Sequence, residues 1–261
     1  MQLNKYLVFT ILFLSVCIEA SYFDFLSSDR RLSYNSLGQT GIINTPSAEI
    51  HDELSIYATF TRNDVWKLGT LTVTPYDWIE ASYFYYRPDD LRWGGAIGLY
   101  LDKGFNVKFS YKPKYKNLPT FAIGLDDFAG TGQFTREFVA STANFKNLKV
   151  TLGLGWGKYA GDKSFRNPLS FIDDRLDFRQ YYFSNQGGSP EYKKWFRGEA
   201  ALFGGAEWFF PKYNGLKLKI ELDPFDYLDF SCCGEGRGPL TEFYRQKDSD
   251  INFGISYPLN D

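Results

Sequence analysis

Apolar and polar side chains alternate with a period of two along most of the chain after residue 53. In the first such segment Leu54, Ile56 and Phe60 share one face, whereas Ser55 and Thr59 lie on the other. The same alternation is clear over 105–112, 150–157, 216–223 and 251–257. Alternation of this kind is typical of β-strands with one apolar and one polar face. We count about eleven such segments between turn sequences, and none carries a helical stripe, so we expect an all-β chain.

Two architectures produce such strands, and the period alone does not separate them. A soluble sandwich buries its apolar faces, whereas a transmembrane barrel turns them to lipid and keeps its polar faces inside. An export signal, aromatic residues at the ends of apolar faces and glycines at alternate positions favour the barrel. The aromatic residues are Tyr111, Trp156 and Tyr257, and the glycines are Gly153, Gly155 and Gly157. We therefore expect an antiparallel transmembrane β-barrel of about 10–12 strands, with a short N-terminal segment and one long loop.

The N-terminus is expected to be a separate targeting element. Residues 1–20 combine a basic start, a short apolar run and a small residue at the end, which is the layout of a secretory signal peptide. Cys17 follows the bulky Val16, which disfavours lipoprotein processing. Together with the barrel, this signal predicts the outer membrane of a Gram-negative bacterium. The expected divisions are a signal peptide at 1–20, a polar segment at 21–52, and a barrel domain at 53–261 with a long loop at about 159–197.

Charge and cysteine content exclude several classes of function. The chain carries 29 Lys and Arg against 31 Asp and Glu, so it has no basic field for nucleic acid. Cys232 and Cys233 are adjacent, and the sequence leaves open whether they form a vicinal disulfide or remain thiols. With His51 as the single histidine, the chain offers no recognisable metal site, and we expect no metal and no cofactor.

One stretch, FAIGLDDFAGTGQFTREFVA (121–140), breaks the alternation. Asp126 and Asp127 are adjacent and precede the glycines Gly130 and Gly132. Neighbouring residues of an extended strand point to opposite faces, so this pair would converge on one cavity only in a turn. The preferred interpretation is a structural bend at Gly130 and Gly132, with the carboxylates bonding nearby backbone N–H groups. General acid–base catalysis and ligand contact by Asp126 and Asp127 are the alternatives.

The long polar loop contains the remaining candidates. Tyr181, Tyr182 and Trp195 lie beside charged residues, a combination that binds sugar rings but also packs loops together. Both readings stay open. With Asp126 and Asp127, these aromatic residues are the candidate glycan-facing or lumen-facing side chains. The acidic residues Asp173, Asp174 and Asp177 of the same loop are interpreted as a solvated charge run rather than a Ca²⁺ site.

Several longer motifs follow one another in a recognisable order. They are GQTGIINTPSA (38–48), LPTFAIGLDDFAGTGQFTREFVA (118–140), LKVTLGLGWGKYAG (148–161), FRNPLSFIDDRLDFR (165–179), FRGEAALFGGAEWFFP (196–211) and LKLKIELDPFDY (216–227). Their order resembles the YjbH-like outer-membrane proteins linked to exopolysaccharide production, and the chain is similar to the N-terminal part of these longer proteins. The resemblance implies an outer-membrane barrel associated with export or assembly of a surface polysaccharide. It supplies no catalytic residues.

We therefore expect a non-enzymatic outer-membrane protein that assists exopolysaccharide export or surface assembly. Its expected partners are a polysaccharide, outer-membrane lipid and other exopolysaccharide-secretion proteins. One alternative is a secreted, β-rich glycan hydrolase or lyase with Asp126 or Asp127 as the acid. Another is a structural surface protein without a glycan partner.

Overall fold

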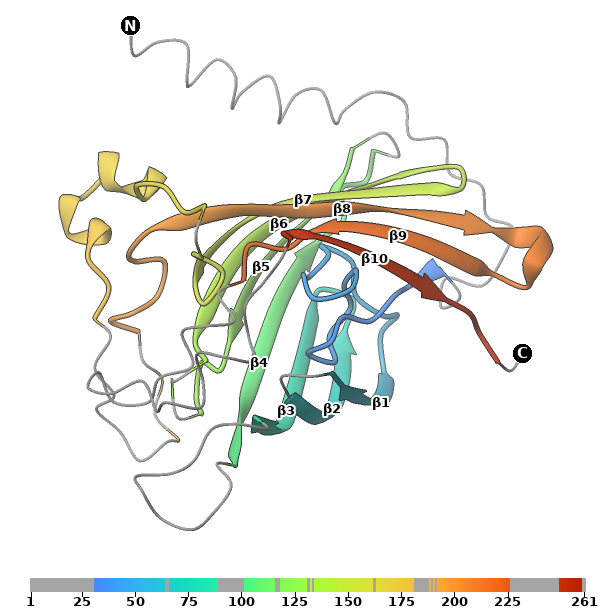
Figure 1. Ribbon diagram of the computed structural model, residues 1–261, viewed down its shortest axis with the longest axis horizontal. Coiled ribbons are helices and arrows are strands. Elements are labelled where there is room, and N and C mark those ends of the chain that lie inside the picture. Colours follow the sequence, from blue (N-terminus) through green and yellow to red (C-terminus); the bar gives the residue numbers. More distant parts are fainter. Residues whose placement is uncertain are drawn as a thin grey trace, which may run out of the picture.

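A computed structural model describes residues 31–63, 66–88, 101–115, 118–130, 132, 134–161, 163–180, 188, 190, 192–225 and 249–259. These residues form one antiparallel sheet of ten strands, paired in chain order from β1 to β10 (Figure 1). The expectation of an all-β antiparallel chain is therefore confirmed. The expected signal peptide, Tyr181, Tyr182 and the two adjacent cysteines lie outside the described residues.

Each strand is joined to the next by a turn or loop and pairs with it. The strands are β1 (Ser55–Arg62), β2 (Trp66–Tyr76), β3 (Ile79–Pro88), β4 (Asp102–Tyr111), β5 (Thr120–Asp126), β6 (Arg136–Phe145), β7 (Leu148–Gly157), β8 (Ala200–Phe210), β9 (Leu216–Leu222) and β10 (Ile251–Ser256). In the described part of the chain three short 3₁₀ helices accompany them, η2 (Pro168–Phe171), η3 (Asp174–Asp177) and η4 (Pro211–Tyr213). No helix in the described ranges has the length and apolar character needed to cross a membrane.

The sheet is curved but open along one seam. Within the described ranges β1 pairs only with β2, and β10 pairs only with β9. The paired strands curl so that one face is concave (Figure 1). We call the concave side the inner face and the opposite side the outer face. The sequence predicted a closed barrel, whereas the described residues form a ten-stranded curved sheet in which β1 and β10 are not paired.

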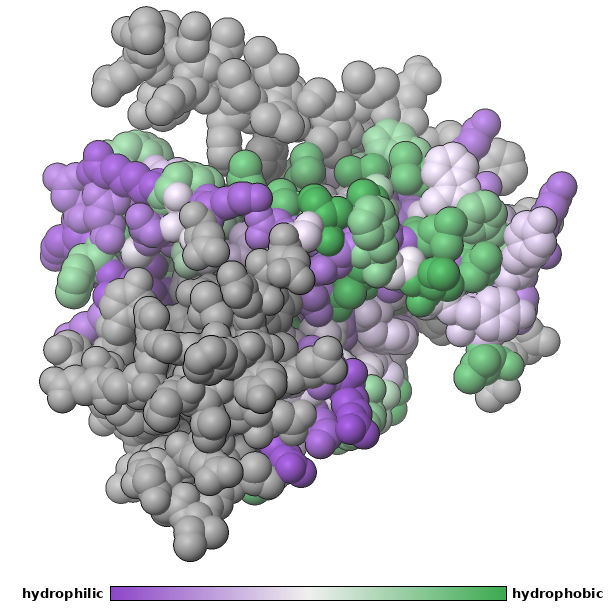
Figure 2. Space-filling model, in the orientation of Figure 1, coloured by the Kyte–Doolittle hydropathy of each residue, from purple (hydrophilic) through white to green (hydrophobic). Residues whose placement is uncertain are grey.

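The two faces carry opposite chemistry, as the alternation predicts. Large apolar side chains are exposed on the outer face of nearly every strand, and they gather in the green region of Figure 2 where β7 to β9 lie. Examples are Ile56, Leu71, Tyr83, Phe105, Ile123, Leu152, Leu202, Leu218 and Phe253. The inner face instead buries polar and charged side chains, including Thr72, Glu80, Lys108, Asp126, Thr142, Glu207 and Glu221. This is the reverse of a water-soluble protein, whose apolar faces are buried.

Residues 31–52, which we call the inner segment, lie inside the curve of the sheet (Figure 1). Its path is fixed by hydrogen bonds within itself, such as Ser36 N to Ile43 O at 2.6 Å and Ile42 N to Thr45 O at 2.9 Å. Leu37 and Ala48 join a buried apolar cluster on the inner face. The segment therefore forms part of the core, although most of its residues are polar.

Glycines on the inner face make room for large aromatic rings from neighbouring strands. A Cβ on Gly153 would lie 2.1 Å from the ring of Phe203, and Gly153 is the cross-strand partner of Phe203. The same relation holds between Gly124 and Phe138, where the distance would be 2.2 Å. The rings of Phe138 and Phe203 then meet edge to face at 6.3 Å. Alternate glycines thus allow aromatic rings to lie flat against the concave side of the sheet.

The described residues 163–180 and 192–199, which we call the cap, pack over the outer face at one end of β6 and β7. The Arg179 guanidinium donates two hydrogen bonds to the buried Glu137 carboxylate, at 2.6 and 3.0 Å. The Asn167 side chain accepts from Trp156 Nε1 at 3.1 Å, and Phe196 packs edge-on against the Trp156 ring. This part of the long loop is therefore anchored to the sheet by buried contacts.

Gly153→Val should destabilise the fold by about 1–3 kcal/mol, because the new side chain would overlap the Phe203 ring. Gly69→Val is the matched control, since nothing lies within 4 Å of a Cβ built on Gly69 of β2. Urea unfolding of the purified variants in detergent measures both. Equal stability of the two variants would contradict the packing role of the inner glycines.

Candidate functional site

The inner face binds the inner segment chiefly through the backbone of that segment. The Glu221 carboxylate accepts hydrogen bonds from three successive backbone N–H groups, those of Ile43 at 2.8 Å, Asn44 at 3.0 Å and Thr45 at 3.0 Å. It also accepts from the Thr45 hydroxyl at 2.8 Å. One buried carboxylate of β9 therefore accepts the backbone N–H groups of a whole turn of the inner segment. These hydrogen bonds are strong because the acceptor is charged.

A second contact joins the inner segment to β3 and β4. Glu80 and Lys108 form an ion pair at 3.0 Å, and neither side chain is exposed. Thr40 lies between them, with its hydroxyl 2.9 Å from Glu80 Oε2 and its carbonyl accepting from Lys108 Nζ at 3.0 Å. The hydroxyl of Tyr57 also donates to Glu80 at 2.9 Å. A buried ion pair needs such additional hydrogen bonds to offset its desolvation.

Lysines of β7 and β9 bind the carbonyl groups of the inner segment. Lys219 donates to Ile42 O at 2.7 Å, Lys149 donates to Arg31 O at 2.8 Å, and Lys217 donates to Leu32 O. Glu207 of β8 lies close to these lysines, 3.8 Å from Lys219 and 4.0 Å from Lys149. The carboxylates of the inner face thus bind donors of the segment, and the lysines bind its acceptors.

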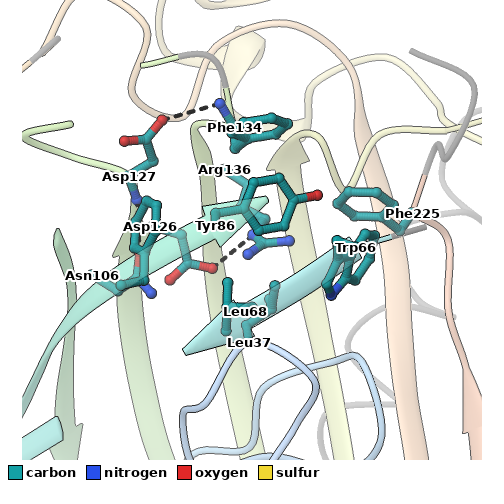
Figure 3. Close-up of a pocket in the computed structure, with 11 residues that line it drawn as sticks. Leu37, Trp66, Leu68, Tyr86, Asn106, Asp126, Asp127, Phe134, Arg136 and Phe225 are labelled. Carbon is teal, nitrogen blue, oxygen red and sulfur yellow. Dashed lines mark hydrogen bonds and ion pairs between the residues drawn. The ribbon is translucent and has the colours of Figure 1, made fainter. Parts of the chain in front are cut away.

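Asp126 is at the end of β5 and belongs to a buried ion pair. Its carboxylate accepts from Arg136 Nε at 2.8 Å (Figure 3) and from Gln39 Nε2 at 2.7 Å. The Arg136 guanidinium also lies 5.1 Å from the ring centre of Tyr159 and 5.5 Å from that of Phe225. Asp126 therefore neutralises a guanidinium that is otherwise enclosed by aromatic rings.

The Asp127 side chain takes no part in the Asp126–Arg136 ion pair, and Asp127 lies at the bend in the chain. Its φ of 52° is in the left-handed region, and its carboxylate accepts from Phe134 N at 3.0 Å (Figure 3). Burial and the nearby Asp102 carboxylate raise the pKa of Asp127 well above its usual value, although the Phe134 N–H lowers it in part. This position thus disfavours the charged form of the carboxyl group relative to a carboxyl group in water.

The two glycines of this stretch differ in what they contribute. Gly132 has a φ of 74°, a conformation that favours glycine, whereas Gly130 is not in the left-handed region. Gly130 is instead required for space, because a Cβ there would lie 1.9 Å from Asp127 Oδ1. The unusual dihedral angles are therefore at Asp127 and Gly132.

The structure does not bring the sequence candidates together in one site. The cavity beside Asp126 and Asp127 is lined by aromatic residues but measures about 20 Å³, room for about one water molecule and none for a sugar ring. Half-buried Trp195 lies in the cap, next to Phe196, which packs against the outer face. In the cap, Asp173 pairs with Arg175 at 2.7 Å, and Asp177 pairs with Arg166 at 2.7 Å.

The residues that bind the inner segment were not singled out from the sequence. Glu80, Lys108 and Glu221 were visible only as polar positions of alternating strands. Another signal was present in the segment itself, because residues 33–48 contain no charged side chain although they are rich in Asn, Gln, Ser and Thr. A neutral polar stretch ahead of strands with charged inner positions is the pattern that could have indicated the contact.

Comparisons with known proteins give a family and a relative. A family model described as "Exopolysaccharide biosynthesis protein YbjH" matches residues 33–261. The "Uncharacterized lipoprotein YjbH" of Escherichia coli (strain K12) is 28% identical over 235 residues, which is 88% of this chain and 32% of that protein. The chain thus spans about a third of the length of this curated relative. No solved structure matches the chain.

Asp126→Asn should destabilise the protein by about 3–5 kcal/mol, because it removes the charge that neutralises the buried Arg136. Asn keeps the size of the side chain and can still accept a hydrogen bond, so the loss reports the ion pair. Chemical unfolding at neutral pH measures the change. A loss below about 1 kcal/mol would show that the pair contributes little.

Asp127 should make stability depend on pH in the opposite sense from a paired carboxylate. Because its pKa is raised in the folded state, the folded protein binds this proton more tightly, and stability falls as pH rises above the unfolded-state pKa. Asp127→Asn should abolish that decline and be at least as stable as the parent at neutral pH. Unfolding curves from pH 4 upward test this, and parallel curves for both proteins would refute it.

Proposed function

Because the chain belongs to the YjbH family of exopolysaccharide biosynthesis proteins, we propose that it is a non-catalytic outer-membrane β-barrel that assists export or surface assembly of an exopolysaccharide. The observation that carries the proposal is the reversed polarity of the sheet. Its apolar side chains are exposed on the outer face, and its charged side chains are buried on the inner face. A barrel in lipid has this distribution.

Exposure on the outer face supports contact with lipid rather than water. Phe253 and Ile255 of β10 are 78% and 74% exposed, and Phe60 of β1 is 76% exposed. Continuous apolar exposure of this extent is unfavourable in water and marks a binding or membrane surface. Strands β2, β3, β4, β6, β7 and β8 have 10 or 11 residues each, the length needed to cross a bilayer when tilted.

Closure of the barrel follows from the cost of unpaired backbone groups in lipid. Each free N–H or C=O in a hydrocarbon environment costs several kcal/mol, so spanning sheets close on themselves. With ten strands in a simple up-and-down order, β1 and β10 run antiparallel and can pair. Both already flank the inner segment: Thr59 of β1 lies close to Gly38, and Gly254 of β10 lies close to Ile43. We propose that β1 and β10 pair in the membrane.

The polysaccharide role comes from the family and not from an assigned binding residue. The family description names exopolysaccharide biosynthesis, and the curated relative is named a lipoprotein, which is consistent with an exported, membrane-associated protein. Other exopolysaccharide-secretion proteins are the proposed partners. The geometry of Asp126 and Asp127 does not support the hydrolase alternative. Asp126 is ion-paired with Arg136, and the cavity beside the two carboxyl groups is too small for a sugar ring.

Cell fractionation and a deletion strain test the proposal together. The folded protein should sediment with outer membranes, and unheated samples should migrate differently from boiled ones in gel electrophoresis. Deletion of its gene should lower the exopolysaccharide on the cell surface. A protein found free in the periplasm would reject the barrel, and unchanged exopolysaccharide would favour a structural surface protein.

Leu218→Arg should cost about 2–4 kcal/mol if the outer face of β9 lies in the hydrocarbon region. Phe171→Arg is the matched control, because Phe171 is 78% exposed in η2 of the cap, outside the strands, and should change stability little. Unfolding of both variants in lipid vesicles measures the difference. If Leu218→Arg were as mild as Phe171→Arg, the outer face would be exposed to water.

A further inference from the structure

The inner face carries more polar chemistry than the inner segment uses. Glu207 is only 3% exposed, and its carboxylate is balanced by Lys219 and Lys149 at 3.8 and 4.0 Å, yet neither of its oxygens accepts a hydrogen bond. The Thr74 hydroxyl of β2 is also buried without a partner. On the segment itself, the Ser36 hydroxyl and Gln39 Oε1 are unsatisfied as well. Buried polar groups in a permanent core are normally almost all paired, so the fit between segment and sheet is incomplete.

The contacts that exist are of a kind that another polar molecule can reproduce. Residues 33–48 carry no charge and present backbone amides, hydroxyls and carboxamides to charged side chains of the sheet. Thr40 and Thr45 place hydroxyl groups 2.9 and 2.8 Å from the carboxylates of Glu80 and Glu221. A hydroxyl on a carboxylate and a hydroxyl on an ammonium group are also the hydrogen bonds that a neutral sugar makes.

From these observations we propose that the inner face is a binding site for a neutral, hydroxyl-rich polymer and that the inner segment occupies this site as a displaceable plug. Glu80, Lys108, Lys219 and Glu221 would exchange their bonds to the segment for bonds to the polymer, and Glu207 would gain a donor. The inference rests on the proposed role of the barrel in polysaccharide export. It adds the chemical class of the ligand and the part of the chain that must move.

The energetic basis is that the segment is held mainly by hydrogen bonds. Ligand hydroxyls can replace those bonds one for one, so the net free energy of exchange is small compared with the number of contacts. The apolar side chains of this segment that are fully buried, which a polar ligand could not replace, are few: Leu37, Ile42, Pro46 and Ala48, with Leu32, Ile43 and Ile50 half-buried. A minor open state of the order of 0.1–10% is sufficient for a ligand to select.

A disulfide between the segment and β10 tests whether the segment must move. In a background with Cys232 and Cys233 changed to Ser, Ile43→Cys is combined with Gly254→Cys, because Ile43 Cδ1 lies 3.0 Å from a Cβ built on Gly254. The control pair is Ala58→Cys with Leu71→Cys, which are cross-strand partners on the outer face of β1 and β2. The control links two strands of the sheet and leaves the segment free.

The full chain is placed in lipid vesicles, and the flux of short neutral dextrans and of anionic oligogalacturonates is measured. Oxidation of the Ile43–Gly254 pair should lower the dextran flux at least about tenfold, and reduction should restore it. The control pair should change little on oxidation. Dextran should cross faster than oligogalacturonate of similar size. Thr45→Val, which removes a bond between segment and Glu221 without altering the sheet, should raise the dextran flux.

The outcomes separate failure of the plug from failure of the barrel. Equal dextran flux in the oxidised and reduced forms would overturn the displaceable plug and leave the proposed barrel intact. Faster passage of the anionic oligomer would overturn the assignment to neutral polymers. If correctly inserted protein, including Thr45→Val, passed no dextran in any form, the conduit and the plug would both be rejected.

Discussion

Every charged side chain on the concave side of the sheet must find a partner inside the molecule. The curvature of the ten strands removes these groups from water, and an unpaired buried charge costs several kcal/mol. The inner segment supplies many of the partners: Glu221 binds three of its amides, and Lys219 and Lys108 bind its carbonyls. The sheet and the segment are therefore parts of one folding unit, and neither satisfies its polar groups alone.

The same constraint explains why the two ends of the inner face are filled by different side chains. At the Asp126 end, aromatic rings and an ion pair fill the space, and inner glycines accommodate the rings. At the end where β7 begins and β8 ends, lysines and Glu207 surround the start of the inner segment. The first end is closely packed by aromatic rings, whereas the second is lined by charged side chains, and each retains polar atoms without a hydrogen-bond partner, such as Gln39 Oε1 and the Glu207 oxygens. Any passage for a polar ligand would therefore depend on the charged end of the inner face.

The cap differs from the inner segment, because it is a polar loop that covers apolar residues of the outer face. The Arg179–Glu137 pair and Asn167 hold it against the Trp156 end of the sheet. The cap thereby shields the end of the outer face, whereas the middle of that face remains exposed. For a sheet in lipid, the border between covered and exposed apolar residues would coincide with one edge of the hydrocarbon region.

The sequence by itself determined the strands, their antiparallel order and the opposite chemistry of their faces. These follow from a period of two and from short turns, which act between near neighbours. Its motif order also pointed to the family that the comparisons then gave. The sequence singled out the stretch with Gly130 and Gly132, but it did not reveal the distinct environments of Asp126 and Asp127, because they depend on Arg136, Asp102 and Gln39 in other elements.

Only the tertiary structure decided which polar residues meet. Glu221 binds Thr45, which is 176 positions away in the chain, and Arg179 binds Glu137 across 42 positions. No local pattern specifies such pairs, because alternation assigns a side chain to a face without saying what lies opposite it. The sheet curls with its polar face inward, so that the polar face is the buried one. As a result, the neutral stretch at 33–48 lies at the centre of the molecule.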